Sequence, residues 1–179
     1  MIVFAIGGWV ASPQQPPTPA RDEIRSAGKL GYWGSILMFI PVINIVGIIL
    51  IILALRRLSK AYNNEAIWRN ALDIVSTIIA GIFAIFAIGV TANVAAPSTQ
   101  NTHYGAAAFI SYVVTVISGR FLSKAYRELW NSSGVKDFDD ASSYTWYGAV
   151  LLIILVGVIL LIVANVHALW GFRKLKNLQ

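Results

Sequence analysis

The chain contains no cysteine, and few of its residues are charged. Among its 179 residues, 12% are Asp, Glu, Lys or Arg, and histidine occurs twice. The absence of cysteine excludes disulfide bonds, thiolate zinc sites and cysteine nucleophiles. The shortage of charge excludes the ordinary surface of a soluble domain, in which about a quarter of all residues are charged.

Apolar residues dominate instead. They make up 57% of the chain, and the mean hydropathy is +0.68. This composition predicts an all-α integral membrane protein in contact with the lipid bilayer. The net charge of +6 would also suit a nucleic-acid-binding protein, but the basic residues lie at the ends of apolar runs and do not form a stripe. We therefore expect no nucleic acid as a partner.

Four long apolar runs predict four transmembrane helices. They cover residues 30–55, 73–94, 104–122 and 146–169. A helix needs about 20 apolar residues to cross the hydrocarbon core. Pro41 lies inside the first run, where it removes a backbone donor, and we expect one helix that is kinked there. The alternative is a re-entrant turn at Pro41, but residues 42–55 are too few to cross alone.

The first twenty residues look unlike the rest of the chain. Met1–Ala11 is a short apolar tip, and Ser12–Ala20 is a proline-rich tether. The tip has neither the basic start of a signal peptide nor the length of a membrane span. Thr18 and Pro19 favour the start of a helix. The charged residues 21–29 then predict a short helix at the membrane interface.

One heptapeptide occurs twice, where apolar runs turn polar. Arg56–Tyr62 and Arg120–Tyr126 match at six of seven positions, and a tryptophan follows each copy. Basic side chains at such places reach lipid phosphates, and aromatic rings settle at headgroup depth. We therefore predict a set of membrane-interface anchors. The set comprises Arg56, Lys60, Tyr62, Trp68, Arg120, Lys124, Tyr126 and Trp130.

The repeat also suggests an internal duplication. Spans one and two would correspond to spans three and four, as two parallel helical hairpins in a pseudo-twofold bundle. With four spans, both tails would lie on the side of the connector between spans two and three. Six basic residues would then lie on that side and eight around the hairpin loops. The positive-inside rule favours the loops as cytoplasmic by a margin that leaves the orientation open.

Small residues recur on the second and third spans at helical spacing. Such stripes let helices approach closely in lipid, so we expect these two helices to face one another or a shared centre. Asn44, beside Pro41, is a polar group near the middle of the first run, and we expect its amide to bond a hydroxyl on another helix. The predicted packing residues are Asn44, Pro41, Ala80, Ala84, Ala107, Ser111, Thr115 and Gly119.

The sequence offers little for chemistry. All eight acidic residues lie outside the apolar runs or at their edges, with Asp73 the deepest. Coupled transporters and most intramembrane enzymes keep ionisable groups within the membrane. His103 and His167 lie in different segments without a second ligand at helical spacing, which disfavours a metal or haem site. We expect no catalytic residue, no metal and no cofactor.

One stretch resembles a known family. The resemblance is closest over residues 29–72, where Lys29-Leu30-Gly31 precedes Pro41 and the sequence ends with Leu58-Ser59-Lys60-Ala61-Tyr62-Asn63-Asn64-Glu65-Ala66-Ile67-Trp68-Arg69-Asn70-Ala71-Leu72. This pattern is similar to an uncharacterised family, a domain of unknown function, of small four-span membrane proteins that are common in archaea. The resemblance implies the architecture and an archaeal origin, and it implies no activity.

These patterns together favour a multi-pass protein of the cell membrane with a structural or interaction role. We expect it to assemble with copies of itself or with partner subunits of a membrane complex, because its predicted cores lack charge and carry small-residue stripes. The alternative is a small uncoupled channel or transporter subunit, lined by the hydroxyls of spans two and three.

Overall fold

The structure, a computed structural model, is all-helical over the residues that it describes, 18–40, 42–94, 100–154 and 156–178. The predicted all-α class is confirmed. The apolar tip, the tether up to residue 17, and Pro41 lie outside the described residues. The helices are α1 (Thr18–Leu37), α2 (Asn44–Ala61), α3 (Glu65–Val94), α4 (Gln100–Ser133), α5 (Asp137–Val150) and α6 (Val156–Lys176), with a 3-10 turn η2 (Leu151–Ile154) before α6.

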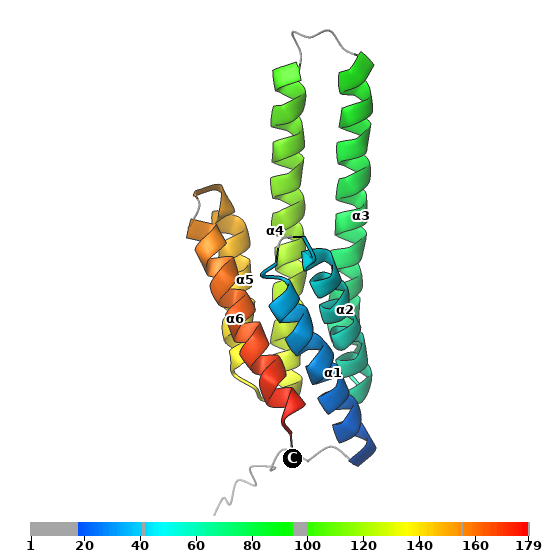
Figure 1. The fold of residues 1–179 in the computed structure, drawn as a ribbon, viewed down its shortest axis with the longest axis vertical. Coiled ribbons are helices and arrows are strands. Elements are labelled where there is room, and N and C mark those ends of the chain that lie inside the picture. The colour runs from blue at the N-terminus through cyan, green and yellow to red at the C-terminus, as the bar shows by residue number, and fades with distance from the viewer. Residues whose placement is uncertain (1–17, 41, 95–99, 155, 179) are drawn as a thin grey trace, which may run out of the picture.

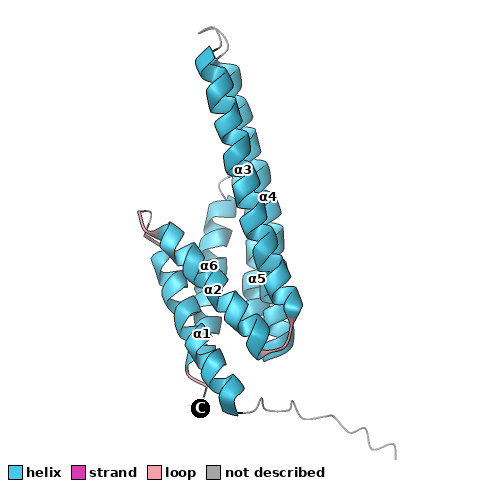
Figure 2. Cartoon of the chain, turned by 90° about the vertical axis from the view of Figure 1, so that its right-hand side faces the viewer, coloured by secondary structure: helices cyan, strands magenta, loops and turns pink. Residues whose placement is uncertain are grey.

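The helices form one long and two short antiparallel hairpins. Helices α3 and α4 make the long hairpin, and the pairs α1/α2 and α5/α6 pack beside its lower half (Figure 1). At 1.5 Å per residue, α3 and α4 are about 45 and 50 Å long, and the other four helices are about 20 to 30 Å long. Figure 2 shows the upper halves of α3 and α4 rising alone above the rest. The lower part of the molecule therefore contains segments of all six helices, and the upper part contains α3 and α4.

The first predicted span is two antiparallel helices. Residues 30–55 form the end of α1, a turn and most of α2. A Cβ atom on Gly34 would lie 2.8 Å from the carbonyl oxygen of Gly47, whereas thirteen residues of one helix would separate these positions by about 20 Å. The predicted single kinked helix is therefore wrong, because the run folds back on itself as two helices. Proline cannot donate to a helix and disfavours helical geometry before it, and the two glycines let the backbones touch.

The fourth predicted span folds back in the same way. Helix α5 ends at Val150, and α6 begins at Val156. A Cβ atom on Gly157 would clash with the carbonyl of Gly148, so the two helices meet backbone to backbone. The Tyr112 hydroxyl on α4 donates to the carbonyl oxygen of Val150 at 2.8 Å, which satisfies a group that the end of α5 exposes.

The predicted four spans therefore do not correspond to four helices. Residues 21–29, predicted as a separate interfacial helix, are part of α1, and the order of two short, two long and two short helices differs from two parallel hairpins. Three described helices are long and apolar enough to cross a membrane, over Glu65–Val90, His103–Ser133 and Val156–Lys176.

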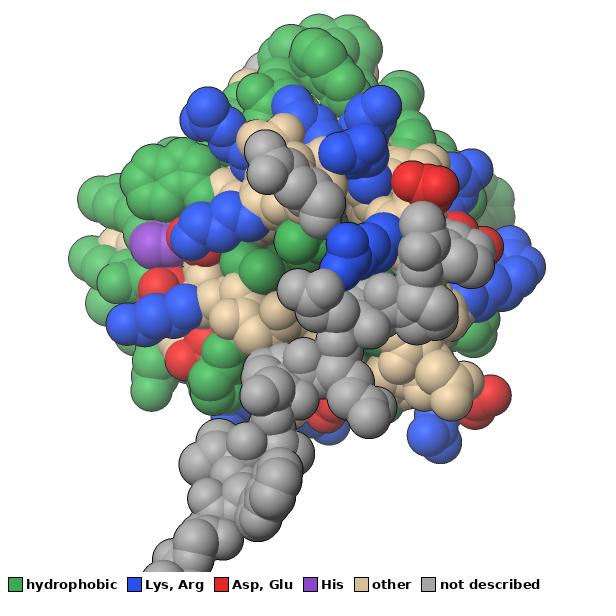
Figure 3. Space-filling view, turned by 90° about the horizontal axis from the view of Figure 1, so that it is seen from below, with side chains coloured by type: hydrophobic (Ala, Val, Ile, Leu, Met, Phe, Trp, Pro, Cys, Tyr) green, Lys and Arg blue, Asp and Glu red, His purple; other side chains and the backbone are tan. Residues whose placement is uncertain are grey.

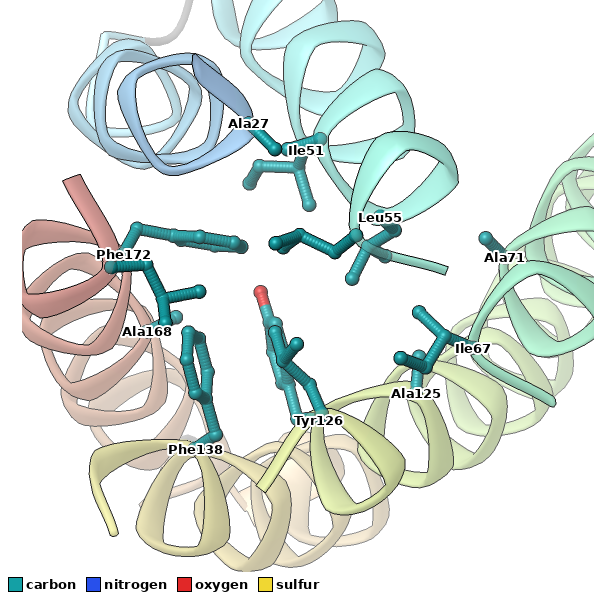
Figure 4. Close-up of a cluster of buried hydrophobic side chains, with 14 of the residues drawn as sticks. Ala27, Ile51, Leu55, Ile67, Ala71, Ala125, Tyr126, Phe138, Ala168 and Phe172 are labelled. Carbon is teal, nitrogen blue, oxygen red and sulfur yellow. The ribbon is translucent and has the colours of Figure 1, made fainter. Parts of the chain in front are cut away.

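An aromatic cluster forms the core of the lower part. The rings of Phe138 on α5 and Phe172 on α6 meet edge to face at 5.1 Å, and both contact Tyr126 on α4. Figure 4 shows Tyr126 reaching inward between these rings and Leu55 of α2. Ala27 of α1 and Ile67 of α3 complete the cluster, so all six helices contribute to it.

The hydrogen bond expected between the Asn44 amide and a hydroxyl on another helix is absent among the described residues. The candidate hydroxyls on the long hairpin donate to the carbonyl four residues earlier in their own helix, and no hydrogen bond between described side chains involves Asn44. These hydroxyls belong to Thr77, Ser111 and Thr115. The bond that does cross between helices runs from the Nδ2 of Asn165 on α6 to the carbonyl oxygen of Ser35 on α1, at 3.0 Å.

The glycine contact gives a direct test of the re-entrant turn. We expect Gly47→Ala to lower the free energy of unfolding by about 1–3 kcal/mol, because the added methyl overlaps the backbone of α1. Gly105→Ala is the matched control, since a Cβ atom there meets nothing within 4 Å. Thermal unfolding in detergent measures both variants. A kinked single span would instead place position 47 against lipid and tolerate the methyl group.

The two asparagines form a second matched pair. We expect Asn165→Leu to cost about 0.6–2 kcal/mol, because it removes the bond to Ser35, and to lower the melting temperature by about 2–4 °C per kcal/mol. Asn44→Leu should leave the melting temperature unchanged. Equal effects in the two variants would contradict a specific role for Asn165.

Candidate functional site

All charged side chains lie at one end of the molecule. The fourteen Lys and Arg and the eight Asp and Glu belong to residues 21–29 of α1, the last parts of α2, α4 and α6, the first parts of α3 and α5, and Lys136 just before α5. We call this region the charged end, and Figure 3 shows it from below. Because both short hairpins fold back, the start of α1 and the end of α6 also lie here. Residues 74–119 carry no Asp, Glu, Lys or Arg.

Contacts at the charged end join helix ends both within one short hairpin and between the two short hairpins. The Lys174 ammonium of α6 lies 2.5 Å from the Asp137 carboxylate of α5. A guanidinium NH of Arg25 on α1 donates to the carbonyl oxygen of Leu178 at 2.9 Å. Exposed contacts of this kind contribute at most about 1 kcal/mol each. Their main effect is to fix how the helix ends are arranged.

The arginine of each repeat copy lies over a tryptophan of the following helix. The Arg56 guanidinium is 5.3 Å from the ring centre of Trp68, and that of Arg120 is 4.9 Å from Trp146. Cations at this distance are attracted by the ring face. The second copy thus pairs with Trp146, whereas Trp130, predicted as an interface anchor, is half-buried against the core. The lysines of the two copies, Lys60 and Lys124, are both exposed.

The tyrosines of the two copies differ in environment. Tyr62 is half-buried just after α2, and burial raises the pKa of its hydroxyl to about 12. Tyr126 is 3% exposed and packs in the aromatic cluster. The interface role predicted for Tyr126 is therefore wrong. The reason is that α4 continues for seven residues beyond the second copy, to Ser133, so its tyrosine faces neighbouring helices.

The serines of the two copies also make different bonds. The Ser59 hydroxyl donates to the carbonyl oxygen of Asn64 at 2.8 Å, which holds the turn between α2 and α3. The Ser123 hydroxyl lies 3.0 Å from that of Ser142, which joins α4 to α5 inside the bundle. The repeat therefore contributes to packing more than to a shared binding surface.

Asn64 is a structural residue that the sequence interpretation missed. Its Oδ1 accepts the backbone N–H of Ala66 at 3.0 Å and so caps α3. Its Nδ2 donates to Glu128 Oε2 at 3.2 Å and to Ser132 Oγ at 3.0 Å, both at the end of α4. One side chain thus joins the lower ends of the long hairpin. An asparagine directly before Glu65 is a helix-start signal that would have identified the capping role.

The packing residues predicted on α3 do not make its closest contact with α4. Helices α3 and α4 do face one another, but Gly81 of α3 makes the close contact, with Val114 of α4. Ala80 is exposed and Ala84 is half-buried. Ser76, Ala80 and Ala87 form an outer face of α3, which we call the small-residue face.

The packing residues predicted on α4 follow a line that turns from α3 toward α5. Ala107 is half-buried and Ser111 is exposed. Thr115 lines a half-open cavity, and Gly119 packs against Ala149 of α5. A strict four-residue spacing drifts around a helix of 3.6 residues per turn, which explains this change of partner.

The cavity has a volume of about 310 Å³ and is lined by residues of α2 to α6 and by Met38, which follows the end of α1. Its lining is almost entirely apolar, with hydroxyls from Thr115, Ser118 and Thr145. The Ser118 hydroxyl is buried without a hydrogen-bond partner. The cavity offers no acid, base or nucleophile stronger than a hydroxyl, and among the described residues no three His, Asp or Glu side chains converge.

His167 of α6 makes contacts outside the cavity. Its ring stacks on Tyr144 at 5.4 Å, and its Nδ1 lies 3.9 Å from the Asp140 carboxylate. These contacts orient the ring on the flank of the α5/α6 hairpin. Such an arrangement favours a packing role for His167.

The chain is similar to other proteins over most of its length. Residues 43–166 match a family described as a protein of unknown function, DUF996. An uncharacterised protein of Methanocaldococcus jannaschii is 32% identical over 169 residues, which covers 87% of this chain and 94% of that protein. No solved structure matches the chain. The resemblance seen in residues 29–72 is confirmed: the chain belongs to the DUF996 family of proteins of unknown function.

Proposed function

We propose that the protein is a non-catalytic, multi-pass protein of the cell membrane with a structural or interaction role. Helices α3 and α4 cross the bilayer, and both short hairpins enter it from the charged end without crossing. The observation that carries this proposal is the charge distribution. The 46 uncharged residues between Asp73 and Arg120 include the upper parts of both long helices, whereas every Lys, Arg, Asp and Glu lies at the opposite end.

Helix lengths support the shallow insertion of the hairpins. The cavity-lining residues Ile51, Ile78 and Leu161 mark one level in α2, α3 and α6. Above that level α2 continues for about 10 Å and α6 for about 8 Å, whereas α3 continues for about 24 Å to Val94. Among the three hairpins, α3/α4 is the one in which both helices match a hydrocarbon core about 30 Å thick. Helix α6 is long enough by itself, but its partner α5 has 14 residues and is too short to return across the core.

The charge distribution also supports one orientation. All fourteen basic residues lie on the side of the charged end, and none lies on the other side. By the positive-inside rule the charged end faces the cytoplasm. With four full spans, eight basic residues would lie on one side of the membrane and six on the other. Because the short hairpins fold back, all fourteen lie on one side.

The small-residue face supports self-assembly. Ser76, Ala80 and Ala87 are exposed, although small residues at this spacing are typical of helix contacts in lipid. Among the described helices, only α4 accompanies the upper half of α3 (Figures 1 and 2). We propose that a second copy packs there through its own small-residue face, as a twofold dimer. The channel alternative has less support, because the hydroxyls of Thr77, Ser111 and Thr115 on the long helices bond within their own helix.

Cysteine labelling tests the topology, and the chain needs no background substitutions because it contains no cysteine. We expect an impermeant maleimide to label Lys136→Cys and Asn177→Cys from the cytoplasmic side and His103→Cys from the outside. Val42→Cys at a hairpin tip should react from neither side. Four full spans would place Asn177 on the same side as His103, and that result would overturn the proposed topology.

Substitution of the small-residue face tests the assembly. We expect the wild type to be a dimer in mild detergent and Ala80→Leu to shift it toward monomer, because the larger side chain separates the two α3 helices. Ile82→Leu is the matched control on another exposed face of α3. Light scattering gives the mass, and oxidative cross-linking of Ser76→Cys reports the same contact in membranes. A monomeric wild type with no cross-link would refute self-assembly.

A further inference from the structure

The free ends of both short hairpins expose large apolar side chains. Val42 is 88% exposed and Ile45 is 66% exposed at the α1/α2 tip. Ile153 and Ile154 at the α5/α6 tip are 75% and 59% exposed. Each such side chain costs about 1–3 kcal/mol in water relative to an apolar environment. The exposed side chains of the two tips are therefore more stable when an apolar environment covers them.

Lipid chains of the leaflet at the charged end fit these tips. Arg120 lies on α4 two residues below the cavity-lining Ser118, and Arg56 lies on α2 next to the cavity-lining Leu55. The excess of basic over acidic residues at this end suits anionic headgroups. Trp33 and Trp170, on the outer surface of the two hairpins, are 57% and 48% exposed. Exposed tryptophans next to basic residues are typical of helices at headgroup depth.

The two leaflets would then hold different amounts of protein. A helix about 10 Å wide occupies about 80 Å² of membrane, so the four short helices occupy about 300 Å² in the leaflet at the charged end. The opposite leaflet holds α3 and α4 alone. The tips reach about 10 Å past the cavity level, a depth at which inserted helices respond to membrane curvature.

We propose that the protein acts as a wedge that prefers, and at high density induces, membrane curvature toward the charged end. The interaction surface is the pair of apolar hairpin tips, and its partner is the lipid leaflet on the side of the charged end. This inference rests on the topology proposed above. It does not require the dimer, because parallel copies would add their wedges.

The test compares the orientation of the protein in small sonicated and large extruded vesicles of one lipid composition. Lys136→Cys carries an impermeant dye that reports the fraction of charged ends facing outward. We expect that fraction to exceed the inward fraction about threefold in small vesicles, whose outer leaflet is expanded, and to approach one half in large vesicles. This excess of outward-facing charged ends in small vesicles, the orientation bias, should persist in zwitterionic lipid.

Variants of the hairpin tips test whether the wedge, and not another property of the protein, causes the orientation bias in small vesicles. We expect the double variant Val42→Asp and Ile153→Asp to lose the size-dependent bias, because charged tips leave the hydrocarbon, and Val42→Leu with Ile153→Leu to keep it. Both tips are exposed, so circular dichroism should show an intact fold in both variants.

Different results contradict the wedge and the topology. A bias that is equal in the two vesicle sizes, or that vanishes without anionic lipid, overturns the wedge while the topology stands. Labels at Lys136 and Asn177 on opposite sides of the vesicle would instead overturn the topology itself.

Discussion

The backbone contact between α1 and α2 determines where much of the chain can lie. Gly34 and Gly47 have no side chains to separate the helices, so the carbonyl of each occupies the space that a Cβ atom of the other would need. In lipid, where the hydrophobic effect does not drive helices together, such close packing provides much of the attraction. The contact turns an apolar run of spanning length into a short hairpin. The end of α2, and with it the start of α3, is thereby held beside the charged end.

Polar groups are used sparingly, and several of those within the bundle bridge two helices. Asn165 bonds α6 to α1, Tyr112 bonds α4 to the end of α5, and Ser123 meets Ser142 between α4 and α5. An unpaired polar group costs more in an apolar environment than in water. These few bonds therefore specify which helices meet, while the aromatic cluster fills the space between them.

The helical class and the membrane character followed from composition, and the uncharged upper part of the long hairpin followed from the apolar runs 73–94 and 104–122. The turns between α1 and α2 and between α5 and α6 could not be predicted in this way, because hydropathy is the same for one straight apolar helix and for two helices that fold back. Pro41 and the glycines near it indicated a possible fold-back, but the length of the apolar run favoured the prediction of one full span. Tyr126 and Asn64 were missed for a related reason: their partners lie on helices distant in sequence, and a local pattern does not show how long α4 continues. The small residues of α3 were recognised, but periodicity alone does not tell the inner face of a helix from the outer one.

The uncharged stretch from Ile74 to Gly119 has a consequence for how the protein reaches the membrane. In the proposed topology, this stretch is all of the described chain that has to enter the hydrocarbon core fully or pass beyond it, and it contains no Asp, Glu, Lys or Arg. Moving a charged side chain to the centre of a bilayer costs at least about 2.5 kcal/mol. Helices α3 and α4 can thus be inserted together as one unit after synthesis, without transfer of any charged residue.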